Sequence, residues 1–212
     1  MKLKYLLCIF YFLILRGISF SQDNSENNIS IINRLIDESF LSPGNKLTEL
    51  GKDKFYGISF DPGNQSESYL FDRFKNRFYD YKLIVNENSD SINYVIKFKD
   101  PLINTKYKKI YTDNVIGVKK IVREITVSYK FEISTRINSD SDSLRIILNQ
   151  NYNKKSKDNI DLDKLTYTED SRYKFSSSEL PEESTLNQIM FPAIIVAASA
   201  AAIILFFTIR SK

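Results

Sequence analysis

Hydrophobic and polar residues alternate most strictly between Ile121 and Ile137. One side of this pattern carries Ile121, Ile125, Val127, Tyr129, Phe131, Ile133 and Ile137. The other carries Glu124, Thr126, Ser128, Lys130, Glu132, Ser134 and Arg136. A period of two predicts a strand with one covered face and one face in water. These 17 residues exceed the usual strand of about five or six, so we expect a bend or bulge.

Shorter alternating segments surround this strand. The pattern predicts strands over Lys54–Phe60, Lys82–Val85, Ile92–Lys99, Tyr107–Thr112 and Leu144–Tyr152, with a last edge strand at Arg172–Phe175. Polar residues at Asn86–Ser91 predict a hairpin turn, and the polar stretch Lys154–Leu165 predicts a loop.

A helical period marks two segments of the N-terminal half. Ile29–Leu41 places Ile32, Leu35, Ile36 and Phe40 on one face. Ser42–Asn45, which contains Pro43 and Gly44, predicts a break before a short helical turn at Lys46–Leu50 that ends at Gly51.

The second helix is predicted over Glu67–Tyr81. Its aromatic stripe, Phe71, Phe74, Phe78 and Tyr81, is typical of a helix that packs on a sheet. We therefore predict an α+β fold in which two N-terminal helices pack on one face of a mainly antiparallel, twisted sheet.

Residues 1–21 have the three parts of a secretory signal peptide. Lys2 and Lys4 precede the apolar run Tyr5–Leu15, and small residues before Gln22 offer a cleavage site. The run is shorter than the roughly 20 residues of a bilayer crossing, although an uncleaved N-terminal anchor is an alternative. The pattern places residues 22–175 in an exported domain.

The C-terminal end predicts one transmembrane helix. Residues 191–209 contain no charge, and Arg210 and Lys212 follow them. Since positive residues stay on the cytoplasmic side, residues 210–212 are expected inside the cell and the domain outside, in a periplasmic or extracellular position. Residues 176–190 are then a juxtamembrane linker. A glycolipid-anchor signal starting at Ser176–Ser178 is the alternative for a eukaryotic source.

This topology changes the meaning of the overall charge. The formal net charge is +4, but five of the 30 basic residues (Lys2, Lys4, Arg16, Arg210 and Lys212) lie outside the exported part. That part keeps 25 basic against all 26 acidic residues, a net charge of −1. The basic pI therefore does not predict a nucleic-acid partner.

Few chemical groups are available for catalysis. The chain has no histidine, and its one cysteine, Cys8, lies in the signal run. This composition excludes most zinc sites, Cys–His proteases and the Ser–His–Asp hydrolases. The spacing of Asn138, Asp140 and Asp142 begins like a calcium loop but lacks the later glycine and glutamate, which favours a solvated turn. We expect no cofactor and no enzymatic activity.

Two sets of residues are candidates for intermolecular contacts. A local basic cluster could meet an anionic partner: Lys106, Lys108, Lys109, Lys119 and Lys120. Ala193, Ala197 and Ala201 repeat every four residues in the predicted span, a spacing that lets helices approach and could form a homo-oligomer. The simpler interpretation of the lysine cluster is an ordinary solvated surface. The simpler interpretation of the three alanines is that they only make the predicted span apolar.

These observations predict a non-enzymatic, single-pass protein of the cell envelope that binds or scaffolds other membrane or periplasmic components. The alternative is a surface receptor or adhesin-like domain. In a eukaryotic host it would carry glycans at Asn28-Ile29-Ser30 and Asn64-Gln65-Ser66.

Overall fold

The domain is built on one five-stranded sheet with the order β2-β1-β3-β4-β5. The computed structural model describes residues 26–85, 91–112, 117–136, 144–182 and 185–210. The strands are β1 (Phe55–Ser59), β2 (Lys82–Ile84), β3 (Tyr94–Thr112), β4 (Lys119–Arg136) and β5 (Leu144–Asp161). The predicted signal peptide and the predicted turn at Asn138–Ser143 lie outside the described residues.

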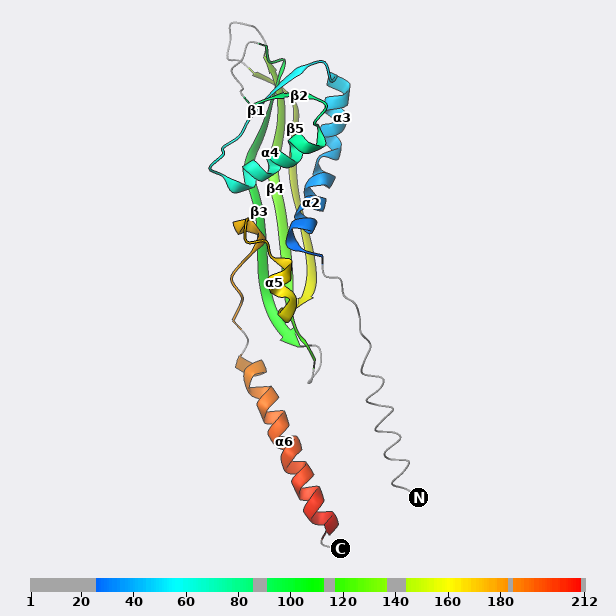
Figure 1. Ribbon diagram of the computed structural model, residues 1–212, viewed down its shortest axis with the longest axis vertical. Helices are drawn as coiled ribbons and strands as arrows, with labels where there is room; N and C mark the ends of the chain where they lie inside the picture. Colours follow the sequence, from blue (N-terminus) through cyan, green and yellow to red (C-terminus); the bar gives the residue numbers. More distant parts are fainter. Residues whose placement is uncertain (1–25, 86–90, 113–116, 137–143, 183–184, 211–212) are drawn as a thin grey trace, which may run out of the picture.

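Three helices cover one face of this sheet, where the sequence predicted two (Figure 1). They are α2 (Asn28–Ser39), α3 (Leu41–Leu50) and α4 (Gln65–Arg77). Farther along the sheet, the short elements η1 (Leu162–Lys164), α5 (Leu165–Thr168) and η2 (Lys174–Ser176) follow β5. The α+β prediction is confirmed at the level of a sheet and several helices.

The predicted break at Ser42–Asn45 is wrong, because α3 runs through it. Pro43 lies in the first turn of α3, where a proline removes no intrahelical hydrogen bond. The chain changes direction one turn earlier, at Phe40. Gly51 ends α3 with φ 96°, a conformation that favours glycine, so the predicted stop is confirmed.

The predicted hairpin between Lys82–Val85 and the next strand is also wrong. β1 lies between β2 and β3 and is parallel to both. Helix α4 makes the crossover from β1 to β2, as parallel neighbours require. The sheet is therefore mixed: β3, β4 and β5 are antiparallel, while β1 and β2 form a parallel edge.

Two of the three long strands, β3 and β5, extend farther than the sequence pattern predicted. β3 is continuous where two strands were expected, and it bulges at Asp100 (φ 51°) before Pro101. β5 continues to Asp161 through the stretch predicted as a loop. Arg172–Phe175, predicted as an edge strand, instead leads into η2.

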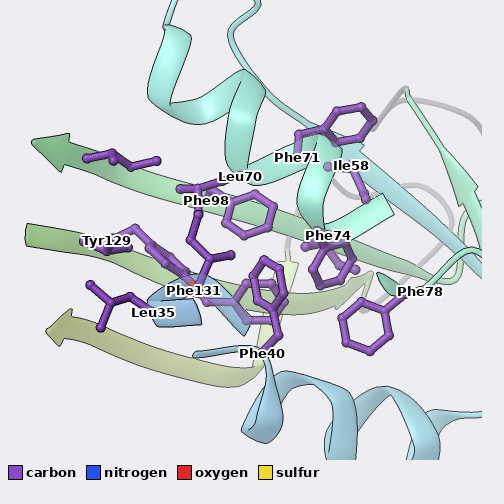
Figure 2. Packing of buried hydrophobic residues seen from close by; sticks show 14 of the residues in the cluster. Leu35, Phe40, Ile58, Leu70, Phe71, Phe74, Phe78, Phe98, Tyr129 and Phe131 are labelled. Atoms are coloured by element: carbon purple, nitrogen blue, oxygen red, sulfur yellow. The ribbon is translucent and has the colours of Figure 1, made fainter. Parts of the chain in front are cut away.

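An aromatic core lies between the helices and the sheet (Figure 2). Phe74 of α4 is fully buried, and its ring centroid lies 5.3 Å from that of Phe40 and 4.6 Å from that of Phe78. The same ring lies 5.7 Å from Phe131 of β4. The predicted packing of the aromatic stripe on the sheet is confirmed. A second cluster, centred on Ile110, Ile121 and Ile160, lies near the far end of the long strands.

Helix α6 (Thr185–Arg210) follows the domain and begins inside the predicted linker. Within the part of the chain that the structure describes, no helix combines the length and hydropathy needed for a membrane crossing. The predicted transmembrane helix is therefore without support from the structure. After the last domain residues, Phe175 and Ser176, which are buried, residues 177–182 form neither helix nor strand.

Candidate interaction surface

The face of the sheet opposite the helices is rich in lysine. The alternation of each strand turns every second side chain outward, and the register aligns these side chains in rows across β3, β4 and β5. We call this surface the lysine face. In the paired rows from Glu124 to Glu132, and at Lys108 beside them, its charged residues are Lys97, Lys99, Lys106, Lys108, Lys130, Lys155 and Lys157, together with Glu124 and Glu132. Seven positive groups against two negative ones give these rows a positive charge, although residues 22–209 together are nearly neutral.

The lysines gather in two clusters, each around one glutamate. In the Glu132 cluster, the Lys99 Nζ lies 2.9 Å and the Lys130 Nζ 3.9 Å from the carboxylate of Glu132. Lys97 is the register partner of Glu132 on β3. The glutamate side chain is only 8% exposed, while that of Lys99 is 43% exposed. The lysines therefore cover the carboxylate and present their charge to solvent.

The Glu124 cluster repeats this arrangement eight residues earlier on β4. Lys108 Nζ donates to Glu124 at 2.6 Å, and Lys155 Nζ lies 3.7 Å from the other carboxylate oxygen. Lys106 and Lys157 flank Glu124 in the register. The hydrogen bond from Lys108, with the neighbouring lysine charges, lowers the pKa of Glu124. The carboxylate thus stays ionised and offsets one of four positive charges.

Neutral side chains separate the two clusters. The rows between them contain Leu102, Ser128 and Asn153, then Asn104 and Thr126 beside Lys155. Leu102 is 50% exposed, and these rows contain no aromatic residue. The lysine face therefore has two positive ends and a polar middle.

The basic cluster predicted from sequence lies on the β3–β4 hairpin. Lys106 and Lys108 belong to the Glu124 cluster, whereas Lys109 falls at the register shift between Tyr107 and Ile110. Lys119 and Lys120 pair with Thr112 and Tyr111 farther along the same hairpin. The sequence prediction missed Lys155 and Lys157, because β5 was expected to end before them. The alternation signal, extended past Tyr152, would have placed both on the outer face.

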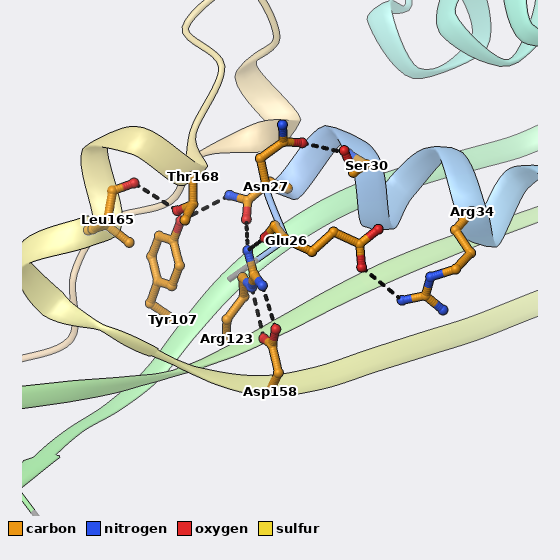
Figure 3. A network of polar contacts seen from close by, with 10 residues as sticks. Glu26, Asn27, Ser30, Arg34, Tyr107, Arg123, Asp158, Leu165 and Thr168 are labelled. Atoms are coloured by element: carbon orange, nitrogen blue, oxygen red, sulfur yellow. Dashed lines mark hydrogen bonds and ion pairs between the residues drawn. The ribbon is translucent and has the colours of Figure 1, made fainter. Parts of the chain in front are cut away.

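A second polar site is buried on the helix side, at Arg123 (Figure 3). This side chain lies on the covered face of β4 and is fully buried, although it carries a charge. Its Nε donates to Asp158 Oδ1 of β5 at 2.8 Å, and Nη2 donates to the other carboxylate oxygen. Nη1 donates to the Glu26 carbonyl at 2.8 Å and to Asn28 Oδ1 at 2.6 Å.

Asn28 and Tyr107 extend this network to the C-terminal part of the domain. Asn28 Nδ2 donates to the Ser176 carbonyl at 2.6 Å and to the Tyr107 hydroxyl at 3.1 Å. That hydroxyl donates to Glu169 Oε1 at 2.8 Å. Burial raises the pKa of Tyr107 to about 12, so it remains a neutral donor. The Arg123 network thus joins the start of α2, three strands and the segment that leads toward α6.

One residue signals this network in the sequence, although the predicted pattern did not include it. Arg123 occupies an inward position between Ile121 and Ile125, in a stretch of β4 whose other inward residues, up to Ile133, are aliphatic or aromatic. A lone charge in such a position requires a buried partner, but the sequence does not show which acid supplies it. Only the pairing of β4 with β5 brings in Asp158.

The same network bears on glycosylation. Asn28, the acceptor of the first sequon, is fully buried and uses its side-chain amide in two hydrogen bonds. A glycan on that nitrogen has no room in the folded domain. Asn64, the second acceptor, caps α4 by accepting from the backbone N–H groups of Ser66 and Glu67. The burial of Asn28 weakens the sequence argument for a glycosylated receptor.

Two other surface depressions of the domain contain charged side chains that are already paired with each other. A shallow depression of about 560 Å³ borders α2, and its two acids are paired with arginines, Asp37 with Arg73 at 2.6 Å and Glu38 with Arg34 at 3.7 Å. A smaller one of about 320 Å³ lies over Tyr167–Arg172, where Arg172 pairs with Asp170 at 2.6 Å. Among the described residues, no group of three acidic, histidine or cysteine side chains is arranged to hold a metal ion.

The predicted helix-association residues lie in α6. Ala193, Ala197 and Ala201 fall on one stripe of that helix and are exposed. A single chain does not test whether this stripe meets a second helix, so the association stays a prediction.

Comparison with known proteins gave no relative. No family model matches the chain, and neither the curated proteins nor the solved structures contain a significant match.

Proposed function

We propose that this chain is a non-enzymatic, membrane-anchored envelope protein whose α+β domain binds an anionic partner through the lysine face. The observation that carries this proposal is the separation of charge. Seven lysines gather on the uncovered side of three strands around only two glutamates. An exposed field of one sign attracts a partner of the opposite sign and orients it.

The rest of the domain supports a binding role. The depressions beside α2 and over Tyr167–Arg172 contain acids that are already paired with arginines. The composition provides no histidine and no cysteine outside the signal run for acid–base or nucleophilic chemistry. A rigid sheet, backed by an aromatic core, presents side chains at fixed spacings and therefore suits recognition.

Photocrosslinking in native membranes tests the binding surface. A photoreactive residue at Ser128, in the middle of the lysine face, is expected to capture a partner, whereas one at the exposed Asp72 of α4 is not. Capture must fall at least about tenfold when Lys106, Lys108, Lys155 and Lys157 are replaced by glutamine, and it must weaken with salt. The matched control replaces Lys46, Lys52 and Lys75 on the helix side. Equal loss with both sets would refute the lysine face as the contact.

The anchor is a separate part of the proposal and rests on the sequence. Residues 191–209 carry no charge, and Arg210 and Lys212 follow. We expect the full chain to stay with membranes through alkaline extraction and a chain that ends at Gln188 to be released. Protease added outside intact inner-membrane vesicles of normal orientation should digest the domain. Release of both chains by alkaline extraction would contradict the membrane anchor. Protection of the domain from protease would contradict the predicted orientation.

A further inference from the structure

We infer that the partner of the lysine face is an extended acidic polypeptide segment that lies along the strands and contacts both lysine clusters at once. This inference rests on the proposed function and specifies its partner. The first argument is spacing. Glu124 and Glu132, the centres of the two clusters, are eight residues apart on β4, which corresponds to roughly 26 Å along a strand. An extended segment with two acidic blocks spans this distance.

The second argument is the direction of the positive charge. Within each cluster the lysines come from different strands, so each cluster crosses the sheet, and the two are displaced along the strand axis. A ligand that reaches both must run along the strands. A small anion can occupy only one cluster and gains nothing from the other.

The third argument is the chemistry between the clusters. Ser128, Asn104 and Asn153 offer hydroxyl and amide groups that can hydrogen-bond to a peptide backbone. Leu102 is exposed and can contact an apolar side chain. The absence of an aromatic ring from these rows gives no stacking surface for sugars.

A bilayer surface fits the same face less well. Strands of a sheet are rotated by about 20–25° relative to their neighbours, so two clusters at different heights of a twisted sheet do not face one plane. Proteins that lie on membranes also insert apolar side chains into the interface, and in the rows from Glu124 to Glu132 the only apolar side chain on this face is Leu102.

Peptides with one or two acidic blocks test the inference on the full-length chain in neutral detergent. One peptide carries two tetraglutamate blocks whose centres are eight residues apart, joined by a serine–asparagine spacer. A second carries one block, and a third carries both blocks with no spacer. We expect the spaced peptide to bind at least about tenfold more tightly than the single-block peptide, because the second contact is intramolecular.

Two matched variants locate the contacts. Lys97, Lys99 and Lys130 are replaced by glutamine in one, and Lys106, Lys108, Lys155 and Lys157 in the other. Either variant should reduce the affinity for the spaced peptide to that for the single block. Each variant should still bind the single block through its remaining cluster, which also shows that it is folded. The helix-side variant with Lys46, Lys52 and Lys75 replaced should bind like the parent.

The outcomes separate this inference from the proposed function. Equal affinities for the one-block and spaced peptides, or equal affinities for the spaced and unspaced peptides, overturn the two-cluster contact. If dextran sulfate or micelles with an anionic phospholipid bind through the lysines and the peptides do not, the inference fails and the anionic-partner function stands. If no anionic probe binds through the lysines, both fail.

Discussion

Replacing Asp158 with alanine is expected to lower the free energy of unfolding by about 3–5 kcal/mol, because it leaves the guanidinium of Arg123 buried without its counter-charge. Arg123 is fully buried, whereas the Asp158 side chain is 39% exposed. Replacing Arg123 with methionine should therefore cost less, since the remaining carboxylate can reach water. The asymmetry follows from which of the two charges is desolvated.

A double-mutant cycle tests this explanation. The chain that carries both Arg123→Met and Asp158→Ala should be more stable than the Asp158→Ala chain, because no unpaired charge is left inside. Stability is measured by urea unfolding and followed by tyrosine fluorescence, which suits a chain with 13 tyrosines and no tryptophan. Alanine at the exposed Asp72 serves as the control. A double variant less stable than Asp158→Ala would contradict a desolvation penalty at Arg123.

Replacing Phe74 with alanine is expected to cost about 3–5 kcal/mol. The side chain has no exposed surface, and its ring packs against Phe40, Phe78, Phe98 and Phe131. These neighbours come from a helix–helix junction, from the end of α4 and from two strands, so the cavity cannot close by moving one of them. The lost stability combines the transfer free energy of the ring with the energetic cost of the cavity that remains.

The same unfolding measurement checks this prediction against a surface tyrosine of the same helical region. Tyr79 is 82% exposed, and its replacement with alanine should change stability by less than about 0.5 kcal/mol. Phe74→Leu, which keeps most of the volume, should fall between the two. If Phe74→Ala were as stable as Tyr79→Ala, the aromatic cluster would not be the centre of the core.

The Arg123 network and the lysine face have different roles: the network stabilises the fold, and the lysine face is the proposed binding surface. The hydrogen bonds of the network connect the start of α2 and the Ser176 segment to the long strands. It therefore holds together the two ends of the folded domain, from which the chain continues toward the predicted signal and toward α6. The lysine face lies on the opposite side of the same strands and is free of this structural task. Variants of one are expected to leave the other unchanged.

The local pattern of the sequence determined the faces of the elements. The alternation from Ile121 to Ile137 predicted which side of β4 is covered, and the aromatic stripe that begins with Phe71 and Phe74 predicted the buried side of α4, although α4 ends at Arg77, before Phe78 and Tyr81. These predictions hold because burial follows the period of the backbone, two in a strand and 3.6 in a helix. Composition likewise limited the chemistry of the site, because a chain without histidine lacks imidazole chemistry in every fold.

Only the tertiary structure decided which segments are neighbours. The insertion of β1 between β2 and β3, and the extension of β5 past Tyr152, depend on hydrogen bonds between distant parts of the chain. Those pairings bring Asp158 to Arg123 and Lys157 to Glu124, and they place Lys155 one row away, where its side chain reaches the same carboxylate. A local pattern shows which way a side chain points, but not which strand will lie beside it. For that reason the sequence found part of the lysine face, and the register of three strands completed it.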